Sequence, residues 1–380
     1  MNHALRTCLI VLFALPAMLQ ARQNTVPTDS LRLPEHFKIA GFIVDSLTKK
    51  PVQSAGIFVN NTSLDTVSLR NGYYRLSRVP MGKHEIVVTA VGYMPRTVII
   101  NGALPTTSAD TIRLLSVQPV PLNEMMARTS DKRWQFFYQK FKENFIGTTD
   151  FAKEVKIINP WVLRFEELEN KEWSAMADDL LLLENMALGY RLKCYLKQLA
   201  VAKQIAVFDA CLFFEPIKTL DQRLADRWRS NRLIAYRGSL MEFLRRMAEK
   251  NTDSLYRTFR LRGTERFYHT TEPDPQSAST FSDLKQPVSY PHEFALNFSR
   301  DQLQINYYGA GEDMAYRRFV NRMTKIQRLP ARFRASWLAS RSSQVIVNRM
   351  GYFNNAMEVE VYGYWEYLRI AERLPITYFP

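Results

Sequence analysis

The sequence predicts a multi-domain protein in which an N-terminal all-β sandwich precedes an α+β domain with mainly antiparallel strands. Its 380 residues exceed what one apolar core usually organises. From Phe37 onward, alternating apolar runs recur about every 8 to 12 residues between turn residues, which is typical of a sandwich. After residue 131, helical and strand periodicities mix without a regular βαβ alternation, and this favours an α+β domain.

The first residues, MNHALRTCLIVLFALPAMLQA, have the layout of a cleaved signal peptide. Arg6 precedes an apolar run from Cys8 to Leu15, which is shorter than the roughly 20 residues of a membrane-spanning helix. Cys8 lies inside the run, and this position disfavours lipid attachment. We therefore expect residues 1–21 to be a signal peptide, residues 22–36 to be an exposed leader, and the protein to be exported, as a periplasmic or outer-membrane-associated protein.

Residues 37–116 supply about seven short strands, beginning with FKIAGFIVD and AGIFVNN. The runs TVSLR and YYRLS flank Asn71 and Gly72, a pair that tolerates the positive φ angles of a two-residue hairpin turn. The turn VPMG, with Pro80 and Gly82, precedes the strand HEIVVTAVGY, and RTVII and DTIRLL complete the set. We expect both turns to be hairpin turns.

Three segments in this order carry a family resemblance: IAGFIVDSLTKKPVQSAGIFV, RNGYYRL and VPMGKHEIVVTAVGY. They resemble the carboxypeptidase regulatory-like domain, a transthyretin-like (Ig-like) β-sandwich found near the N-terminus of Bacteroidetes exported and outer-membrane proteins. The resemblance implies an accessory module at about residues 37–116 and supplies no catalytic residues. The order of signal, sandwich and basic C-terminal region is also similar to exported proteins of this type, and that similarity implies no activity.

Residues 117–131 contain two prolines and few apolar residues, so we interpret them as a linker to a basic α+β domain at residues 132–380. The following aromatic residues recur at helical spacing and predict a core-facing helix: Trp134, Phe137, Tyr138, Phe141 and Phe145. Residues 220–251 predict one or two basic helices broken near Gly238. Later runs such as HEFALNFS, QLQINYYG and MEVEVYGYW predict strands, and EYLRIAERLP predicts a short closing helix.

Two cysteines, Cys194 and Cys211, remain after the signal peptide. They lie on two predicted strands, Leu188 to Ala200 and Gln204 to Phe214. A tight turn centred between Ala202 and Lys203 would place Cys194 opposite Cys211, where a structural disulfide would close a loop of about 15 residues. The alternative is two buried thiols side by side, and the sequence leaves both possibilities open.

No catalytic, cofactor-binding or metal site is supported by the sequence. His269-Thr-Thr-Glu272 matches part of a zinc carboxypeptidase motif, but the last histidine, His292, follows too closely to be the distant third ligand. There is no nucleophile elbow, and Gly309–Met314 (GAGEDM) fits a connecting loop and lacks the features of a phosphate loop. Asp178, Asp179 and Glu184 have helical spacing and are interpreted as a solvated face, and His84 as a surface residue.

The formal net charge of +14 is the strongest functional signal in the composition. For an exported protein it favours an anionic glycan, lipopolysaccharide or an envelope protein as partner, with possible peripheral membrane association, and it does not point to nucleic acid. Three segments interleave arginine with aromatic residues: 227–232, 259–267 and 328–341. We expect a non-catalytic envelope protein that binds or scaffolds a partner; the alternative is an envelope hydrolase, acting on peptides or glycans, with its site in residues 132–380.

Overall fold

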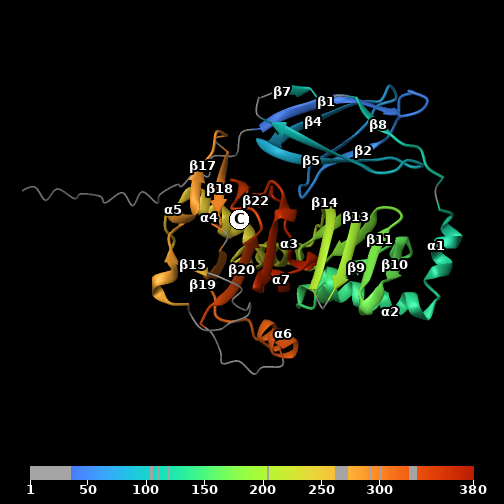
Figure 1. The fold of residues 1–380 in the computed structure, drawn as a ribbon. Helices are drawn as coiled ribbons and strands as arrows, with labels where there is room; N and C mark the ends of the chain where they lie inside the picture. The colour runs from blue at the N-terminus through green and yellow to red at the C-terminus, as the bar shows by residue number, and fades with distance from the viewer. Residues whose placement is uncertain are drawn as a thin grey trace, which may run out of the picture. The chain divides into compact units, whose positions relative to one another are not determined.

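A computed structural model describes residues 36–102, 106–108, 111–118, 120–202, 205–261, 273–290, 292–299, 301–324 and 332–380. The predicted signal peptide and all of the predicted leader except His36 therefore lie outside the described residues. The described chain is rich in antiparallel sheets, with an N-terminal sandwich followed by a mixed α+β region, as predicted (Figure 1). Among the described residues, no helix is both long and apolar enough to span a bilayer.

The described residues of the sandwich form eight strands in two sheets. One sheet contains β1 (His36–Asp45), β4 (Tyr73–Pro80), β7 (Thr106–Ser108) and β8 (Ile112–Leu114), and the other contains β2 (Gly56–Val59), β3 (Asp65–Val67), β5 (Gly82–Thr89) and β6 (Arg96–Gly102). Apolar side chains alternate inward from both sheets, so that Ile39, Ile57 and Ile86 are fully buried in a common core.

The two predicted hairpin turns connect different sheets, and that prediction is wrong. The Asn71-Gly72 turn joins β3 to β4, and Met81 joins β4 to β5, but β4 pairs with β1 whereas β3 and β5 belong to the other sheet. Gly72 has a φ of +78°, as expected of an Asn-Gly turn. The sequence correctly predicted a turn at Asn71-Gly72. The pairing partner of each strand, however, depends on burial of the inner faces of the two sheets.

The first core of the C-terminal region forms where a helix covers a six-stranded sheet. The helix α2 (Lys132–Phe141) continues into the π-helix η1 (Lys142–Ile146), and the sheet contains β9 (Val155–Ile157), β10 (Leu163–Glu167), β11 (Trp173–Ala177), β12 (Leu181–Asn185), β13 (Tyr190–Ala202) and β14 (Ile205–Pro216). Trp134, Phe137, Phe141 and Phe145 are buried against it, as the aromatic spacing predicts.

The predicted linker at 117–131 contains a helix, α1 (Leu122–Arg128). Arg128 forms an ion pair of 2.5 Å with Asp178, which ties this helix to the six-stranded sheet. Asp178 and Asp179 lie between β11 and β12, and Glu184 lies in β12. The prediction of helical spacing for these three carboxylates is therefore wrong, because the surrounding apolar residues pair as strands.

A second core forms between two further sheets and four helices. The first sheet contains five strands: β15 (Tyr256–Leu261), β16 (Ala278–Ser279), β19 (Gln302–Tyr307), β20 (Arg334–Ser340) and β23 (Val359–Gly363). The second sheet contains four strands: β17 (Lys285–Pro287), β18 (Glu293–Asn297), β21 (Gln344–Asn348) and β22 (Tyr352–Phe353). The helices are α4 (Leu240–Glu249), α5 (Phe281–Leu284), α6 (Met314–Thr324) and α7 (Tyr364–Tyr367), and α3 (Gln222–Tyr236) precedes them. The predicted break near Gly238 separates α3 from α4.

Short 3-10 turns also occur in the described part of this region: η2 (Phe151–Glu154), η3 (Pro160–Val162), η4 (Glu169–Lys171), η5 (Pro275–Ser277) and η6 (Ala356–Glu358). Another 3-10 turn, η7 (Ile370–Glu372), returns the chain to the first core, where Ile370, Ala371 and Leu374 are buried. The amide of Asn185 donates to the Ala371 carbonyl at 2.9 Å. In the described part of residues 132–380, the end of the chain therefore links the two large apolar cores, and a smaller cluster is formed by Phe259, Leu261, Phe333, Ala335 and Trp337.

The sandwich contacts the C-terminal region along one seam. Phe58 packs against Phe213, the Asn61 amide donates to Leu212, and the Ile376 amide donates to the Asn61 carbonyl at 2.7 Å. On β5, Glu85 accepts from Lys197 at 2.8 Å, and Tyr352 donates to the Lys83 carbonyl. All of these contacts come from residues 58–62 and 81–87, near one end of β2 and β5 (Figure 1).

The cysteine hairpin forms as β13 and β14, but its predicted register is wrong. Pairs near the turn, such as Ala202 with Ile205, are offset by two from the predicted sum, and a bulge between Leu196 and Gln198 reduces the offset to one, so Cys194 pairs with Leu212 and Cys211 with Tyr195. A one-residue shift turns side chains to opposite faces of a sheet. Cys194 is buried in the first C-terminal core, whereas Cys211 packs with Phe58 and Val87 at the seam, and both cysteines are free.

Candidate functional site: a basic cleft beside α6

The Arg/aromatic segment at 227–232 is used within the fold. On α3, the Trp228 indole donates to the Met186 carbonyl at 2.7 Å, and Arg232 donates to the carbonyls of Leu188 and Gly189 while it stacks on Tyr190. Arg227 pairs with Glu154. These side chains satisfy the carbonyls of the turn between β12 and β13, so this segment is largely structural.

The other two Arg/aromatic segments, as far as they are described, make similar internal contacts. Arg334 lies over the ring of Tyr364 and donates to its hydroxyl at 2.9 Å. The Trp337 indole donates to Gln304 in the interior. Residues 262–267 and 328–331 of these segments lie outside the described residues. The predicted arginine pattern therefore does not by itself define a binding surface.

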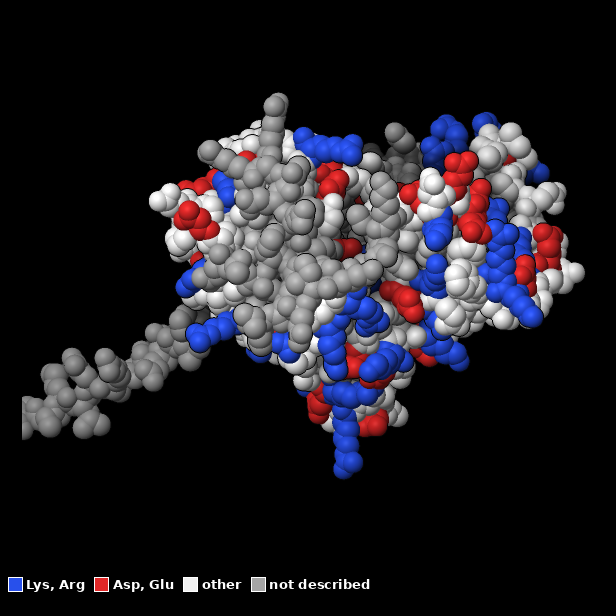
Figure 2. Space-filling model, turned by 60° about the horizontal axis from the view of Figure 1, so that its bottom comes forward, with Lys and Arg blue, Asp and Glu red and all other residues white. Residues whose placement is uncertain are grey.

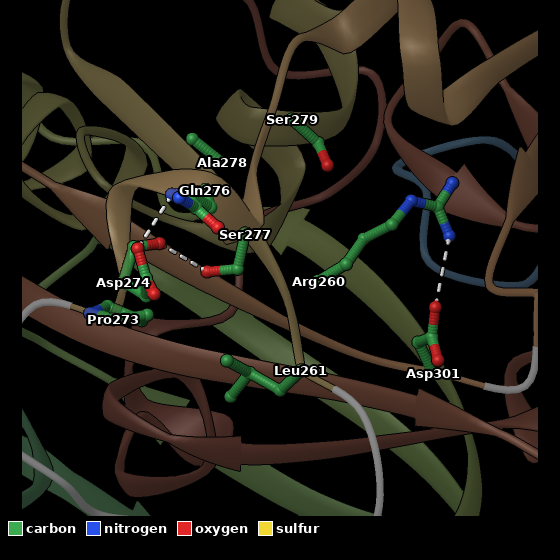
Figure 3. Close-up of a pocket in the computed structure, with 9 residues that line it drawn as sticks. All are labelled: Arg260, Leu261, Pro273, Asp274, Gln276, Ser277, Ala278, Ser279 and Asp301. Atoms are coloured by element: carbon green, nitrogen blue, oxygen red, sulfur yellow. Dashed lines mark hydrogen bonds and ion pairs between the residues drawn. The ribbon is translucent and has the colours of Figure 1, made fainter.

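A polar hollow of about 470 Å³ lies beside β15 and η5, and Figure 3 draws the residues that line it. Asp274 accepts from the Gln276 amide at 2.9 Å and its carbonyl accepts from the Ser277 hydroxyl, so it caps the 3-10 turn η5. Arg260 faces Asp301 at 3.9 Å and donates to the Phe298 carbonyl. Since these charged groups already have local partners, the hollow has little capacity to select a charged ligand.

A second hollow carries unbalanced positive charge. We call it the basic cleft; it has a volume of about 370 Å³ and is lined by Thr148, Asp150, Lys153, Ala315, Arg318, Phe319, Arg322 and Tyr367. Three of its side chains are cationic and one is anionic. Figure 2, which brings the lower side of Figure 1 forward, shows Lys and Arg side chains gathered in the lower centre of the view.

Two separate segments bring these charges together. Gly147 ends the π-helix η1 with a φ of +108° and turns the chain beside Arg369. Asp150 then precedes η2, and Lys153 lies in it. On the opposite wall, Arg318 and Arg322 are four residues apart on α6 and therefore lie on one face of the helix. The rings of Phe319 and Tyr367, with centroids 5.1 Å apart, form an aromatic contact between the helix and α7.

The two walls differ in how their charges are compensated. Asp150 and Lys153 form an ion pair of 2.6 Å, and this ion pair, helped by Arg318, lowers the pKa of Asp150. Arg318 and Arg322 have no ion pair with a carboxylate within 4.0 Å among the described residues. Two guanidinium groups are therefore available for an anion, and each offers a planar set of donors that matches a carboxylate, sulfate or phosphate.

A buried carboxyl group lies behind the cleft. The Thr149 hydroxyl donates to Glu372 Oε1, whereas Glu372 Oε2 is buried and has no hydrogen-bond partner among the described residues. Burial raises the pKa of Glu372 to about 8, so the group is neutral at pH 7. Burial also raises the pKa of Tyr367 to about 12, which keeps its hydroxyl protonated. At neutral pH these two groups therefore add no negative charge, and the carboxylates that act on Tyr367 there are those of Asp150 and Asp313.

Sequence reasoning missed the basic cleft because its walls are about 165 residues apart in the chain. The only local signal was the pair Arg318 and Arg322 at helical spacing, within a segment that also contains other arginines. Lys153 gives no signal of its own. Convergence of these cations depends on packing of α6 against α7.

The remaining sequence-based sites have different outcomes. His269 and Glu272 lie outside the described residues, and the described residues contain no group of three or more potential metal ligands. His84 was interpreted as a surface residue, and this is wrong: it is 4% exposed on β5, with Nε2 at 2.6 Å from the Pro80 carbonyl. Burial lowers its pKa to about 4, despite opposing backbone hydrogen bonds.

Comparison with known proteins identifies the N-terminal part. Residues 39–126 match the model of the family described as CarboxypepD_reg-like domain. The sandwich is a carboxypeptidase regulatory-like domain. The match begins within β1 and ends in α1, so it covers the eight-stranded regulatory-like domain and most of α1, and it leaves the region with the basic cleft unassigned. No curated protein matches the sequence.

Solved structures give only weak similarity. A type II cohesin–X-dockerin complex from Acetivibrio cellulolyticus has 13% identity and a TM-score of 0.21, covering 24% of this chain and 72% of that chain. BcpA, the major pilin subunit of Bacillus cereus, has 18% identity and a TM-score of 0.19, covering 22% and 31%. A DUF3823 family protein from Bacteroides uniformis has 10% identity and a TM-score of 0.17, covering 48% and 100%. Scores this low support no functional transfer.

Proposed function

We propose that this protein is an exported, non-catalytic envelope protein whose basic cleft binds an acidic glycan. The observation that carries the proposal is the pair Arg318 and Arg322 on one wall of the cleft, without a carboxylate partner among the described residues. Half-buried Phe319 adds apolar surface beside these charges, while Tyr367, which is 4% exposed, supports the ring of Phe319 from the core. The regulatory-like domain then acts as a rigid accessory module joined to this region at the seam.

A carboxylate- or sulfate-bearing sugar fits this chemistry better than a neutral sugar. Forked hydrogen bonds from arginine to an oxyanion are roughly twice as strong as neutral hydrogen bonds. Glu372 and Tyr367 are uncharged at neutral pH, and the one carboxylate among the described residues of the cleft lining, Asp150, is paired with Lys153, so the two arginines leave a net positive charge. The cleft volume of about 370 Å³ is suited to one or two sugar rings and not to a large folded epitope.

The test is a titration of the full chain with a heparin oligosaccharide and with oligogalacturonate, each at low and high salt, with maltohexaose as the neutral control. We expect salt-sensitive binding of both acidic probes and none of maltohexaose. Arg318→Glu combined with Arg322→Glu should weaken binding by about tenfold or more. Arg223→Glu combined with Arg229→Glu makes the same charge change on exposed positions of α3 and should have a smaller effect. Equal effects of the two pairs would contradict a specific site.

Export is part of the proposal and has its own test. The signal-like residues 1–21 and the presence of a regulatory-like domain support it. N-terminal sequencing of the protein from an envelope fraction should begin at Arg22. An intact Met1 in protein recovered only from the cytosol would overturn this part without affecting the glycan-binding test.

One observation favours the alternative, a glycan-acting envelope hydrolase. Glu372 has the raised pKa that a general acid needs, and it lies beside the cleft through its contact with Thr149. Against this, the only carboxylate in the cleft lining among the described residues is Asp150, which is paired with Lys153. Release of reducing ends from the acidic probes, abolished by Glu372→Gln, would support the hydrolase and displace the binding proposal.

A further inference from the structure

The sandwich has one end whose surface is unusual. The turns 45–50 and 90–95 and the segment 115–117 come together there, at the opposite ends of β2 and β5 from the seam. Tyr93 forms a side-chain hydrogen bond to Asp45, the Met94 amide donates to Leu115, and the Val117 amide donates to Gly92. These contacts place the three segments side by side, and we call this end the tip.

Large apolar side chains project from the tip into solvent. Val91 is 99% exposed and Leu47 is 71% exposed, and three further side chains from the same segments are also exposed: Met94, Leu115 and Val117. Isolated exposed apolar residues are common, but a contiguous group on neighbouring segments marks an interaction surface. None of the five takes part in the contacts that join the sandwich to residues 132–380.

Cations surround these apolar side chains, and the nearest carboxylate is not available to neutralise them. Lys49, Lys50, Arg96 and Arg113 are exposed around the tip. Asp45 is 5% exposed and accepts hydrogen bonds from the amides of Leu47 and Thr48, which fold the first turn. The exposed charge at this end is therefore positive.

We propose that the tip docks on the surface of an anionic phospholipid bilayer. Apolar side chains on turns insert into the interfacial region of a bilayer, while surrounding lysines and arginines bind the acidic headgroups. The tip has both features: exposed apolar side chains lie on its turns, and lysines and arginines are exposed around them. Its position opposite the seam leaves the C-terminal region free to face away from the membrane.

The test is co-sedimentation of the full chain with vesicles of phosphatidylglycerol and phosphatidylethanolamine, compared with phosphatidylcholine vesicles. We expect binding to the anionic vesicles that weakens with salt. Val91→Asp combined with Met94→Asp should lower the bound fraction by about tenfold, and Lys49→Glu combined with Lys50→Glu should lower it similarly and reduce the salt dependence.

Matched variants elsewhere on the chain control for a general change in charge or hydrophobicity. Because they keep the N-terminal residues, any binding through those residues is the same in every variant. Leu220→Asp changes a fully exposed apolar residue before α3, and Arg223→Glu with Arg229→Glu changes charge on α3. Neither should alter binding by more than about twofold. Wild-type binding by the Val91/Met94 variant, or no binding of the wild type to anionic vesicles, would overturn the proposal. The acidic-glycan titration is independent of either result.

Discussion

Glu372 shows how a single residue becomes chemically distinct through its environment. Burial raises the pKa of its carboxyl group from an ordinary value of 4.5 to about 8, with the hydrogen bond from Thr149 acting in the opposite direction. An unfolded chain therefore releases this proton at lower pH than the folded chain. Between about pH 4.5 and 8, this residue contributes stability that is fully present at the acidic end and is lost as pH rises.

The first prediction follows from this difference. Glu372→Gln keeps an oxygen for the Thr149 hydroxyl but has no proton to lose, so the loss of stability between pH 5 and 8 should shrink by on the order of 2 kcal/mol. Urea unfolding at several pH values measures it. Glu169→Gln, at an exposed position, should leave the pH profile unchanged. An unchanged slope in the Glu372 variant would show that its pKa is ordinary.

The second prediction concerns the two cysteines. Because Cys194 and Cys211 lie on opposite faces of the hairpin, both should be alkylated in denatured protein that has never been reduced. Burial raises the pKa of both thiols, so neither should react rapidly in the folded protein. Peptide mapping by mass spectrometry measures both results. A peptide pair linked through Cys194 and Cys211 would show that the register is different.

At the scale of elements, α4 connects the end of the chain to the second core through Arg245. This side chain is 5% exposed and donates to three carbonyls at 2.7 to 2.9 Å: those of Met350, Ile376 and Tyr378. It also lies over the ring of Phe379, 4.3 Å from its centroid. The guanidinium has enough donors to satisfy all three carbonyls at once, which neither an apolar side chain nor lysine reproduces in this geometry.

The third prediction is that Arg245→Met destabilises the protein by about 3 to 5 kcal/mol, since three carbonyls lose their partner. Arg245→Lys should recover only part of this loss. The control is Arg223→Met on the exposed side of α3, expected to change stability by less than about 0.5 kcal/mol. Chemical denaturation measures all three. A loss below 1 kcal/mol for Arg245→Met would indicate that solvent replaces these bonds.

At the scale of the whole molecule, the seam decides whether the regulatory-like domain and the C-terminal region unfold together. Gly82 has a φ of +117°, and a Cβ atom there would lie 2.1 Å from Asn348 Nδ2. The Asn348 amide donates to the Met81 carbonyl, so this close approach is part of the contact between the two regions. Only glycine combines this backbone angle with this spacing.

The fourth prediction uses a second glycine as a reference. Gly92 has a φ of +79° but nothing lies within 4 Å of its Cβ position. Gly92→Ala therefore measures the backbone cost alone, and Gly82→Ala should cost about 1 to 3 kcal/mol more and separate one calorimetric transition into two. Equal losses in the two variants, with one transition in both, would show that the seam tolerates the added methyl group.

Local sequence patterns determined the kind of most elements, with the helical spacing around Asp178 as an exception, but not the partners of the strands. Three predictions were correct: the helix from Trp134 to Phe145, the break at Gly238 and the strands between Phe37 and Leu115. They were correct because periodicity and turn chemistry act over a few residues. The pairing of strands across Asn71-Gly72 and the register of Cys194 were wrong. In the hairpin, the bulge at Lys197 and a turn one residue later set the register, and the core facing β13 selects which side chains point inward.

The sequence by itself determined the basic composition, the regulatory-like sandwich and the α+β character of residues 132–380. Only the tertiary structure decided which cationic side chains make contacts inside the fold and which remain available for a ligand. It placed Arg232, Arg245 and Arg334 in internal contacts, and it left Arg318 and Arg322 facing a cleft with Lys153. Net charge is a sum over the chain, whereas binding depends on which uncompensated charges converge in space, and that convergence follows from long-range packing.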